Sequence, residues 1–167
     1  MTQAVAYDQA NLLQRLLRRV AASGPGAWLF ARVLHRIDGP VFRMTRGRAT
    51  VASLLSGLPV VMLTSTGAKT GQPRTVPLLG IPDGDGVAII ASNWGQYRHP
   101  AWYYNLKANP DAQISVNGVR RHVRAVPVEG RHRTEIWDSA QRVYPGYSQY
   151  ERRAAHRQIV VFALNPV

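Results

Sequence analysis

The spacing of apolar residues divides the chain into two parts with different periods. From Leu12 to Val20, leucine and valine recur with helical spacing, in a segment that Asp8 can cap and that a Gly-Pro-Gly turn ends at 24–26. A second helical stretch covers 27–37 and stops at Asp38-Gly39-Pro40. The pattern predicts a helical N-terminal arm.

After Pro59 the period becomes that of short strands, each bounded by turn residues. The predicted strands are 60–66, 74–81, 87–92, 112–118, 121–128 and 159–164. Asp83-Gly84-Asp85-Gly86 and Asn117-Gly118 are hairpin signals, which indicates antiparallel pairing. Helices are predicted from His99-Pro100 to Ala108 and from Arg133 to Tyr144. Because these helices are inserted between hairpins rather than alternating with strands, the pattern favours an α+β fold with a small antiparallel β-barrel over a doubly wound sheet.

Length and composition fit this division. The 167 residues suffice for one domain with a real core, so we expect a basic helical arm at 1–50 and a barrel domain at 51–167. The absence of cysteine excludes disulfides and thiol nucleophiles, and redox chemistry would need a bound cofactor. The sequence predicts neither a secretion signal nor a membrane span, and the expected location is cytoplasmic.

The net charge of +12 favours anionic partners. Residues 1–50 hold eight arginines against Asp8 and Asp38, so half of the excess charge belongs to the arm. The arm can pack on the barrel, or it can lie as a basic amphipathic surface on an anionic membrane, and the two arrangements can coexist.

The segment LTSTGAKTGQPRTVP, Leu63 to Pro77, contains the clearest candidate for anion binding. Its turn places Lys69, Arg74 and the hydroxyl of Thr70 around glycines that allow backbone N–H groups to converge on an anion. The spacing is not that of the nucleotide P-loop, and similar turns also join strands that bind nothing. On pattern alone, both interpretations remain open.

Other catalytic chemistry finds little support. The five histidines show neither metal-ligand spacing nor a triad arrangement, and no metal is expected. Trp102 and Leu106 lie four apart on a short helix, which is typical of core residues. Tyr144, Tyr147 and Tyr150 recur every three residues, and they form either a wall for a flat ligand or an aromatic packing corner.

Four motifs together resemble the deazaflavin-dependent nitroreductase family of actinobacteria, whose members bind coenzyme F420 on a split β-barrel related to FMN-binding barrels. The motifs are LTSTGAKTGQPRTVPL, Ala91-Ser92, HPAWYYNLKANP and YPGYSQY. The match begins at Val60 and covers about two-thirds of the chain. It implies a split-barrel fold and a reductase that transfers hydride from reduced F420 to a quinone, a nitro compound or another lipophilic acceptor.

The resemblance also implies roles for individual residues. Lys69, Thr70 and Arg74 would hold the cofactor phosphate and its acidic tail. The deazaflavin groove would be lined by Pro77, Ala91, Ser92, Trp102 and Asn105. Tyr144, Tyr147 and Tyr150 would form the wall over the acceptor, and together with Ser92 they are the candidate catalytic residues. Ala68 stands where the best-known nitroreductase has arginine, and Leu79 where it has a tyrosine that faces substrate.

Two other functions remain as alternatives. Relatives of this barrel sequester cofactors or lipophilic ligands, so a non-catalytic carrier is the second hypothesis. A nucleic-acid-binding barrel is the third, suggested by the charge and by the aromatic residues. Because the arginines cluster on a leucine-rich helix and no RNA-binding signature is present, no nucleic-acid partner is expected.

Overall fold

The computed structural model describes residues 59–116 and 118–167. The predicted helical arm, and the boundary placed at residue 50, lie outside the described residues. No helix in the described part is long and apolar enough to cross a membrane.

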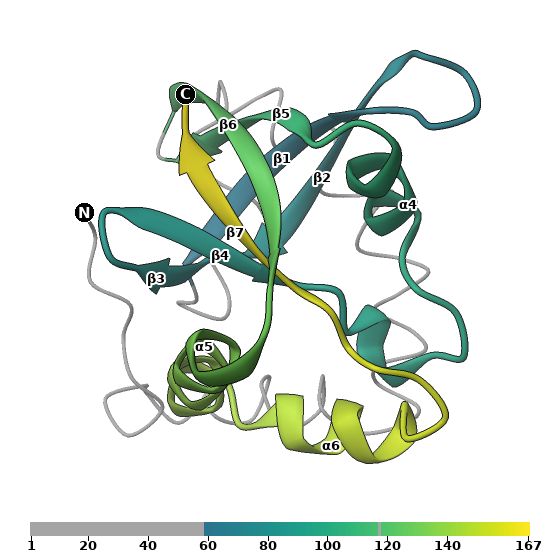
Figure 1. Ribbon diagram of the computed structural model, residues 1–167, viewed down its shortest axis with the longest axis vertical. Helices are drawn as coiled ribbons and strands as arrows, with labels where there is room; N and C mark the ends of the chain where they lie inside the picture. Colours follow the sequence, from purple (N-terminus) through teal and green to yellow (C-terminus); the bar gives the residue numbers. More distant parts are fainter. Residues whose placement is uncertain (1–58, 117) are drawn as a thin grey trace.

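The described chain folds into one strongly curled antiparallel sheet with helices at its ends (Figure 1). Its strands are β1 Val60–Thr66, β2 Pro73–Leu79, β3 Ile81–Asp83, β4 Gly86–Ile90, β5 Asp111–Val116, β6 Val119–Val128 and β7 Val161–Pro166. They are hydrogen-bonded in the order β2-β1-β5-β6-β7-β4-β3, and every pairing is antiparallel. The predicted α+β fold with an antiparallel barrel is therefore confirmed.

One predicted strand is wrong, because the chain bends at Gly80. The sequence predicted a single strand over 74–81, but the structure breaks it into β2 and β3 at Gly80. These two strands are the opposite edges of the sheet, so one residue joins the edges. The Gly80 N–H donates to the Pro59 carbonyl oxygen at 2.8 Å, and a Cβ at Gly80 would lie 2.6 Å from Val61 Cγ1. The bend therefore requires a residue without a side chain.

Three α-helices are described: α4 Ala101–Ala108, α5 Gly130–Val143 and α6 Gly146–Arg153. α4 and α5 match the two predicted helices to within three residues, and Pro100 is the N-cap of α4. The YPGYSQY motif forms the start of α6. In Figure 1, α5 and α6 lie together at one end of the curled sheet, and α4 lies beside the turn between β1 and β2.

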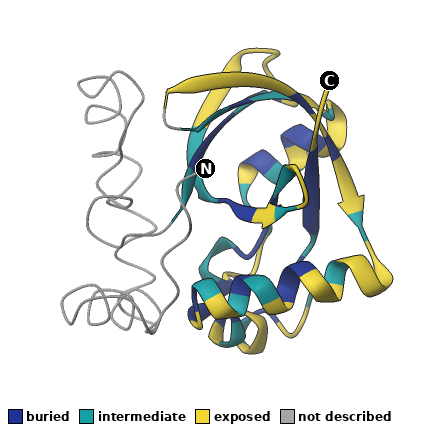
Figure 2. Ribbon diagram, turned by 90° about the vertical axis from the view of Figure 1, so that its left-hand side faces the viewer, coloured by how far each residue is buried: buried dark blue, intermediate teal, exposed yellow. Residues whose placement is uncertain are grey.

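Two buried clusters hold these layers together (Figure 2). The barrel cluster fills the inside of the sheet and includes Leu63, Trp102, Leu106, Phe162 and Leu164. The helix cluster joins α5 and α6 to β3 and β4, and it includes Ile81, Ile136, Trp137 and the three tyrosines of YPGYSQY. Burial of each large apolar side chain stabilises the fold by about 1.5–3 kcal/mol.

Candidate functional site

The turn between β1 and β2 is closed by its own backbone and presents its cations to solvent. The Gly67 N–H donates to the Gln72 carbonyl oxygen at 2.9 Å, and the Gly71 N–H donates to the Gly67 carbonyl oxygen at 2.8 Å. Gly71 has a φ of 67°, which favours glycine. Gly67 is buried, and a Cβ there would lie 2.9 Å from the Thr70 hydroxyl oxygen. Lys69, Thr70 and Arg74 are all exposed around this turn, so they can reach an anion together.

Asn105 of α4 anchors the turn to the body of the domain. Its side-chain oxygen accepts a hydrogen bond from the Ala68 N–H at 3.0 Å, and its side-chain nitrogen donates to the Ser65 hydroxyl at 3.2 Å. Asn105 is 9% exposed and Ser65 is 2% exposed, so water competes weakly for these bonds. The turn is therefore held in one position by a buried polar link.

Ser92 and Ala91 follow β4 in a loop with an uncommon backbone. Asn93, Trp94 and Gly95 all have positive φ, at 47°, 58° and 75°. The left-handed region costs a residue with a side chain on the order of 1 kcal/mol or more. Ala91 is fully buried and Ser92 nearly so. Ser92 itself has ordinary αR angles, and the unfavourable backbone lies in Asn93 and Trp94 directly after it.

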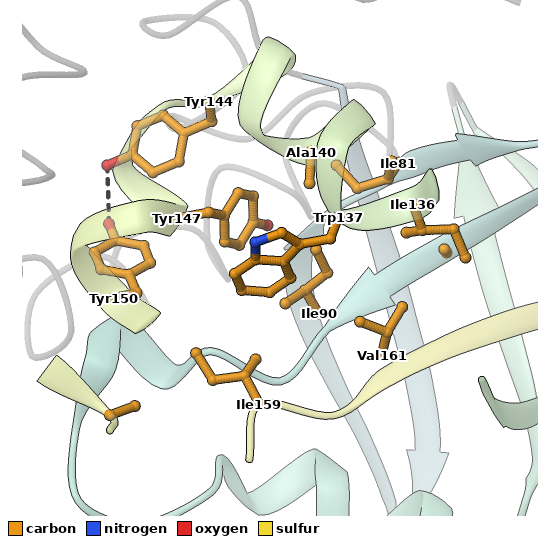
Figure 3. Close-up of a cluster of buried hydrophobic side chains, with 12 residues drawn as sticks. Ile81, Ile90, Ile136, Trp137, Ala140, Tyr144, Tyr147, Tyr150, Ile159 and Val161 are labelled. Atoms are coloured by element: carbon orange, nitrogen blue, oxygen red, sulfur yellow. Dashed lines mark hydrogen bonds between the residues drawn. The ribbon is translucent and has the colours of Figure 1, made fainter. Parts of the chain in front are cut away.

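Tyr144, Tyr147 and Tyr150 pack against one another (Figure 3). They are 6%, 4% and 3% exposed, and the hydroxyls of Tyr144 and Tyr150 are hydrogen-bonded at 2.8 Å. A Cβ at Gly146 would collide with the Tyr144 ring, which explains the glycine in YPGYSQY. The packing-corner interpretation describes this arrangement; the role of acceptor wall stays a prediction.

The environment of two of these phenols keeps them protonated. Burial raises the pKa of Tyr147, and the neighbouring Tyr144 adds to the effect. Burial also raises the pKa of Tyr150, and its bond with Tyr144 contributes further. At neutral pH both are therefore neutral hydrogen-bonding groups.

The structure brings some predicted cofactor residues together and separates others. Ala91 and Trp102 share the barrel cluster, where the Trp102 ring lies 6.1 Å from that of Phe162. Pro77 alternates along β2 with Val76 and Leu78, which pack on the same cluster, so Pro77 faces the other side of the sheet. Trp102 is a core residue, as its helical spacing predicted; its contact with a cofactor stays a prediction.

Two residues of this region were missed by the sequence analysis. In the sequence, Ser65 is an ordinary polar residue of a strand. Only its position, two residues after inward-facing Leu63, could have indicated that its hydroxyl points into the fold. Arg157 donates to three carbonyl oxygens and to the ring of His99 in the 91–99 loop, and nothing in the sequence placed it there. Burial lowers the pKa of this guanidinium, which nonetheless stays charged at neutral pH.

The chain matches a family model described as F420H(2)-dependent quinone reductase over residues 34–166. An F420H(2)-dependent quinone reductase of Mycobacterium tuberculosis is 44% identical over 106 residues, which cover 61% of this chain and 70% of that protein. A solved F420-H2 dependent reductase superposes with a TM-score of 0.59 at 36% identity, covering 64% of this chain and 94% of the other. A structure described as a domain-swapped dimer superposes with a TM-score of 0.62 at 30% identity, covering 85% of this chain and 100% of the other.

Proposed function

Because this chain belongs to the F420H(2)-dependent quinone reductase family, we propose that it uses reduced coenzyme F420 to reduce a quinone or another lipophilic acceptor. The observation that carries the proposal is the anchored turn between β1 and β2. It presents Lys69, Arg74 and the Thr70 hydroxyl at one place and is fixed to α4 through Asn105. Exposed cations on a rigid turn suit the phosphate and acidic tail of this coenzyme.

When bound, the reduced deazaflavin supplies the hydride. In our proposal, Lys69, Thr70 and Arg74 hold the anionic end of the coenzyme. Ala91 and Ser92 set the position of its ring, while Trp102 and Asn105 support that position from within the fold. Pro77 was assigned to the same groove by the resemblance, but its place on the other face of β2 supports it least.

The tyrosines of YPGYSQY are proposed to form the acceptor side of the site. Tyr147 and Tyr150 keep their protons at neutral pH, so they can donate hydrogen bonds that orient a carbonyl oxygen of the acceptor. Their buried, apolar surroundings would also exclude water from the transferring hydride.

Titration with oxidised F420, followed by turnover of reduced F420 with menadione, tests the proposal directly. We expect binding at micromolar concentration and oxidation that depends on the acceptor. Binding of F420 without turnover of menadione, other quinones or a nitroaromatic compound would instead establish the second candidate, a carrier. The closed packing of the three tyrosines favours that candidate. Reduction of nitro compounds is proposed on the resemblance alone, and the nitroaromatic arm of the screen tests it.

We also propose that the protein is cytoplasmic and that the arm at 1–50 brings it to the anionic inner face of the cell membrane, where lipophilic quinones dissolve. The eight arginines and the leucine stripe of the arm support this role. In a flotation assay with anionic vesicles, the full chain should rise with the vesicles, whereas a variant without residues 1–40 should stay at the bottom of the gradient. Equal flotation of both proteins would reject the role of the arm.

A further inference from the structure

Arg157 makes an unusual set of contacts for a residue outside the predicted site. It lies between α6 and β7, and its guanidinium nitrogens all bond to the 91–99 loop. Nη2 donates to the Ser92 carbonyl oxygen at 2.8 Å, and Nε donates to the Gln96 carbonyl oxygen at 3.2 Å. Nη1 donates to the Ala91 carbonyl oxygen at 3.3 Å and to His99 Nδ1 at 3.2 Å. One side chain therefore spans the loop from its first residue to its last.

His156, the residue before it, holds the middle of the same loop. Its ring stacks on Tyr97 with 4.4 Å between centroids and 12° between planes. Its Nε2 also lies 2.9 Å from the Tyr97 carbonyl oxygen. Two consecutive residues thus attach the loop to the segment that follows α6.

The loop also abuts α6 directly. A Cβ at Gly95 would lie 2.8 Å from Arg153 Cβ and 3.0 Å from the Tyr150 carbonyl oxygen. The Trp94 ring meets the Tyr150 ring edge-on at 5.9 Å. Because Asn93 and Trp94 are held at positive φ, the loop would relax toward ordinary backbone angles without these attachments.

We propose that Arg157 is a positioning residue for hydride transfer: it fixes the 91–99 loop, and with it Ser92, against helix α6. The inference rests on the proposed function, which places the coenzyme ring at Ala91 and Ser92 and the acceptor at the tyrosines of α6. Hydride transfer requires the two reactants at a fixed short separation, and a displacement of about 1 Å can cost about 100-fold in rate. The anionic end of the coenzyme is held elsewhere, by the turn between β1 and β2.

The test compares Arg157→Lys with Arg152→Gln, which alters an exposed arginine near the end of α6. Lysine keeps the charge but cannot reach the separate acceptors with a planar fork. At saturating reduced F420 and menadione, we expect Arg157→Lys to slow hydride transfer by about 10-fold or more while the Kd for F420 changes by less than about 3-fold. A coenzyme deuterated at its hydride-donating carbon should give an isotope effect on kcat at least as large as that of the unaltered protein. Arg152→Gln should match the unaltered protein in every measurement.

A second readout does not depend on activity. Arg98 is already exposed, but release of the loop should make the bond after it flexible enough for trypsin to bind. Cleavage there should therefore rise in Arg157→Lys relative to cleavage after Arg131 on α5. If Arg157→Lys does not fold, His156→Leu should show the same two effects at smaller size. A folded Arg157→Lys with unchanged hydride transfer and unchanged cleavage overturns the inference, as does slow turnover with a reduced isotope effect. Failure of the unaltered protein to oxidise reduced F420 would instead reject the proposed function.

Discussion

Replacement of Gly80 by alanine tests the argument that one small residue joins the two edges of the sheet. The new Cβ would lie 2.6 Å from Val61 Cγ1 and 3.1 Å from Val87 Cγ1, whereas ordinary contacts begin at 3.4 Å. Val61 is 3% exposed, so it has little room to move. Overpacking of this kind costs about 1–3 kcal/mol, and the loss of glycine freedom in the unfolded chain offsets about 0.4–1 kcal/mol. We expect Gly80→Ala to lower the free energy of unfolding by about 1–2 kcal/mol.

Urea unfolding followed by tryptophan fluorescence measures this change, and the slope with denaturant should stay constant. Gly86→Ala is the matched control, because its Cβ would meet nothing closer than the Leu164 carbonyl oxygen at 3.2 Å, and its loss should be smaller. Combining Gly80→Ala with Val61→Ala should recover about 1 kcal/mol relative to additivity, since the second change removes the clashing methyl groups. A Gly80→Ala variant as stable as the unaltered protein, or a strictly additive double variant, would refute the steric explanation.

Four further outcomes are expected. Lys69→Ala should raise the Kd for F420 about 5-fold to 10-fold without changing kcat, whereas Tyr147→Phe should change acceptor turnover and leave that Kd nearly intact; equal effects on Kd contradict the assignment. Asn105→Ala should lower the free energy of unfolding by about 1–3 kcal/mol in urea, because it leaves buried Ser65 without its partner. Gly146→Ala should cost about 1–3 kcal/mol in the same assay, and Tyr144→Ala in the same chain should relieve part of that cost. Burial, then the charges of Arg157 and Lys107, lower the pKa of His99, which also packs against Tyr103 and Tyr104. The unfolded chain therefore binds this proton more readily, so the contribution of His99 to stability is full above about pH 6.5 and is lost as the pH falls below it. His99→Gln should remove this contribution and flatten the decline in the free energy of unfolding measured from about pH 7.5 to 5.

The sequence was most informative where local chemistry decides the structure. The strand at 60–66 and the hairpins at Asp83–Gly86 and at Gly118 follow from alternation and from glycine in turns, and all appear in the structure. The bend at Gly80 was not predicted because the residues around it form a continuous apolar run that is typical of one strand. The need for glycine comes from the close approach of Val61, which is distant from Gly80 in sequence.

The candidate site divides in the same way. Lys69, Thr70 and Arg74 lie within six residues of one another, so their grouping around one turn could be predicted. Arg157 and Ser65 could not, because their partners lie about 60 and 40 residues away along the chain. Long-range hydrogen bonds leave no periodic trace in a single sequence.

The link between Asn105 and residue 68 has a consequence for protein engineering. Asn105 contacts the backbone N–H of Ala68, and the side chain of Ala68 is exposed. Substitution at this position therefore leaves the turn's anchor intact. If the turn holds the acidic tail as proposed, a library of charged and neutral side chains at residue 68 should contain variants that prefer coenzymes with longer or shorter tails. The preference for one length of coenzyme tail could thus be changed without altering the residues proposed to position the deazaflavin ring.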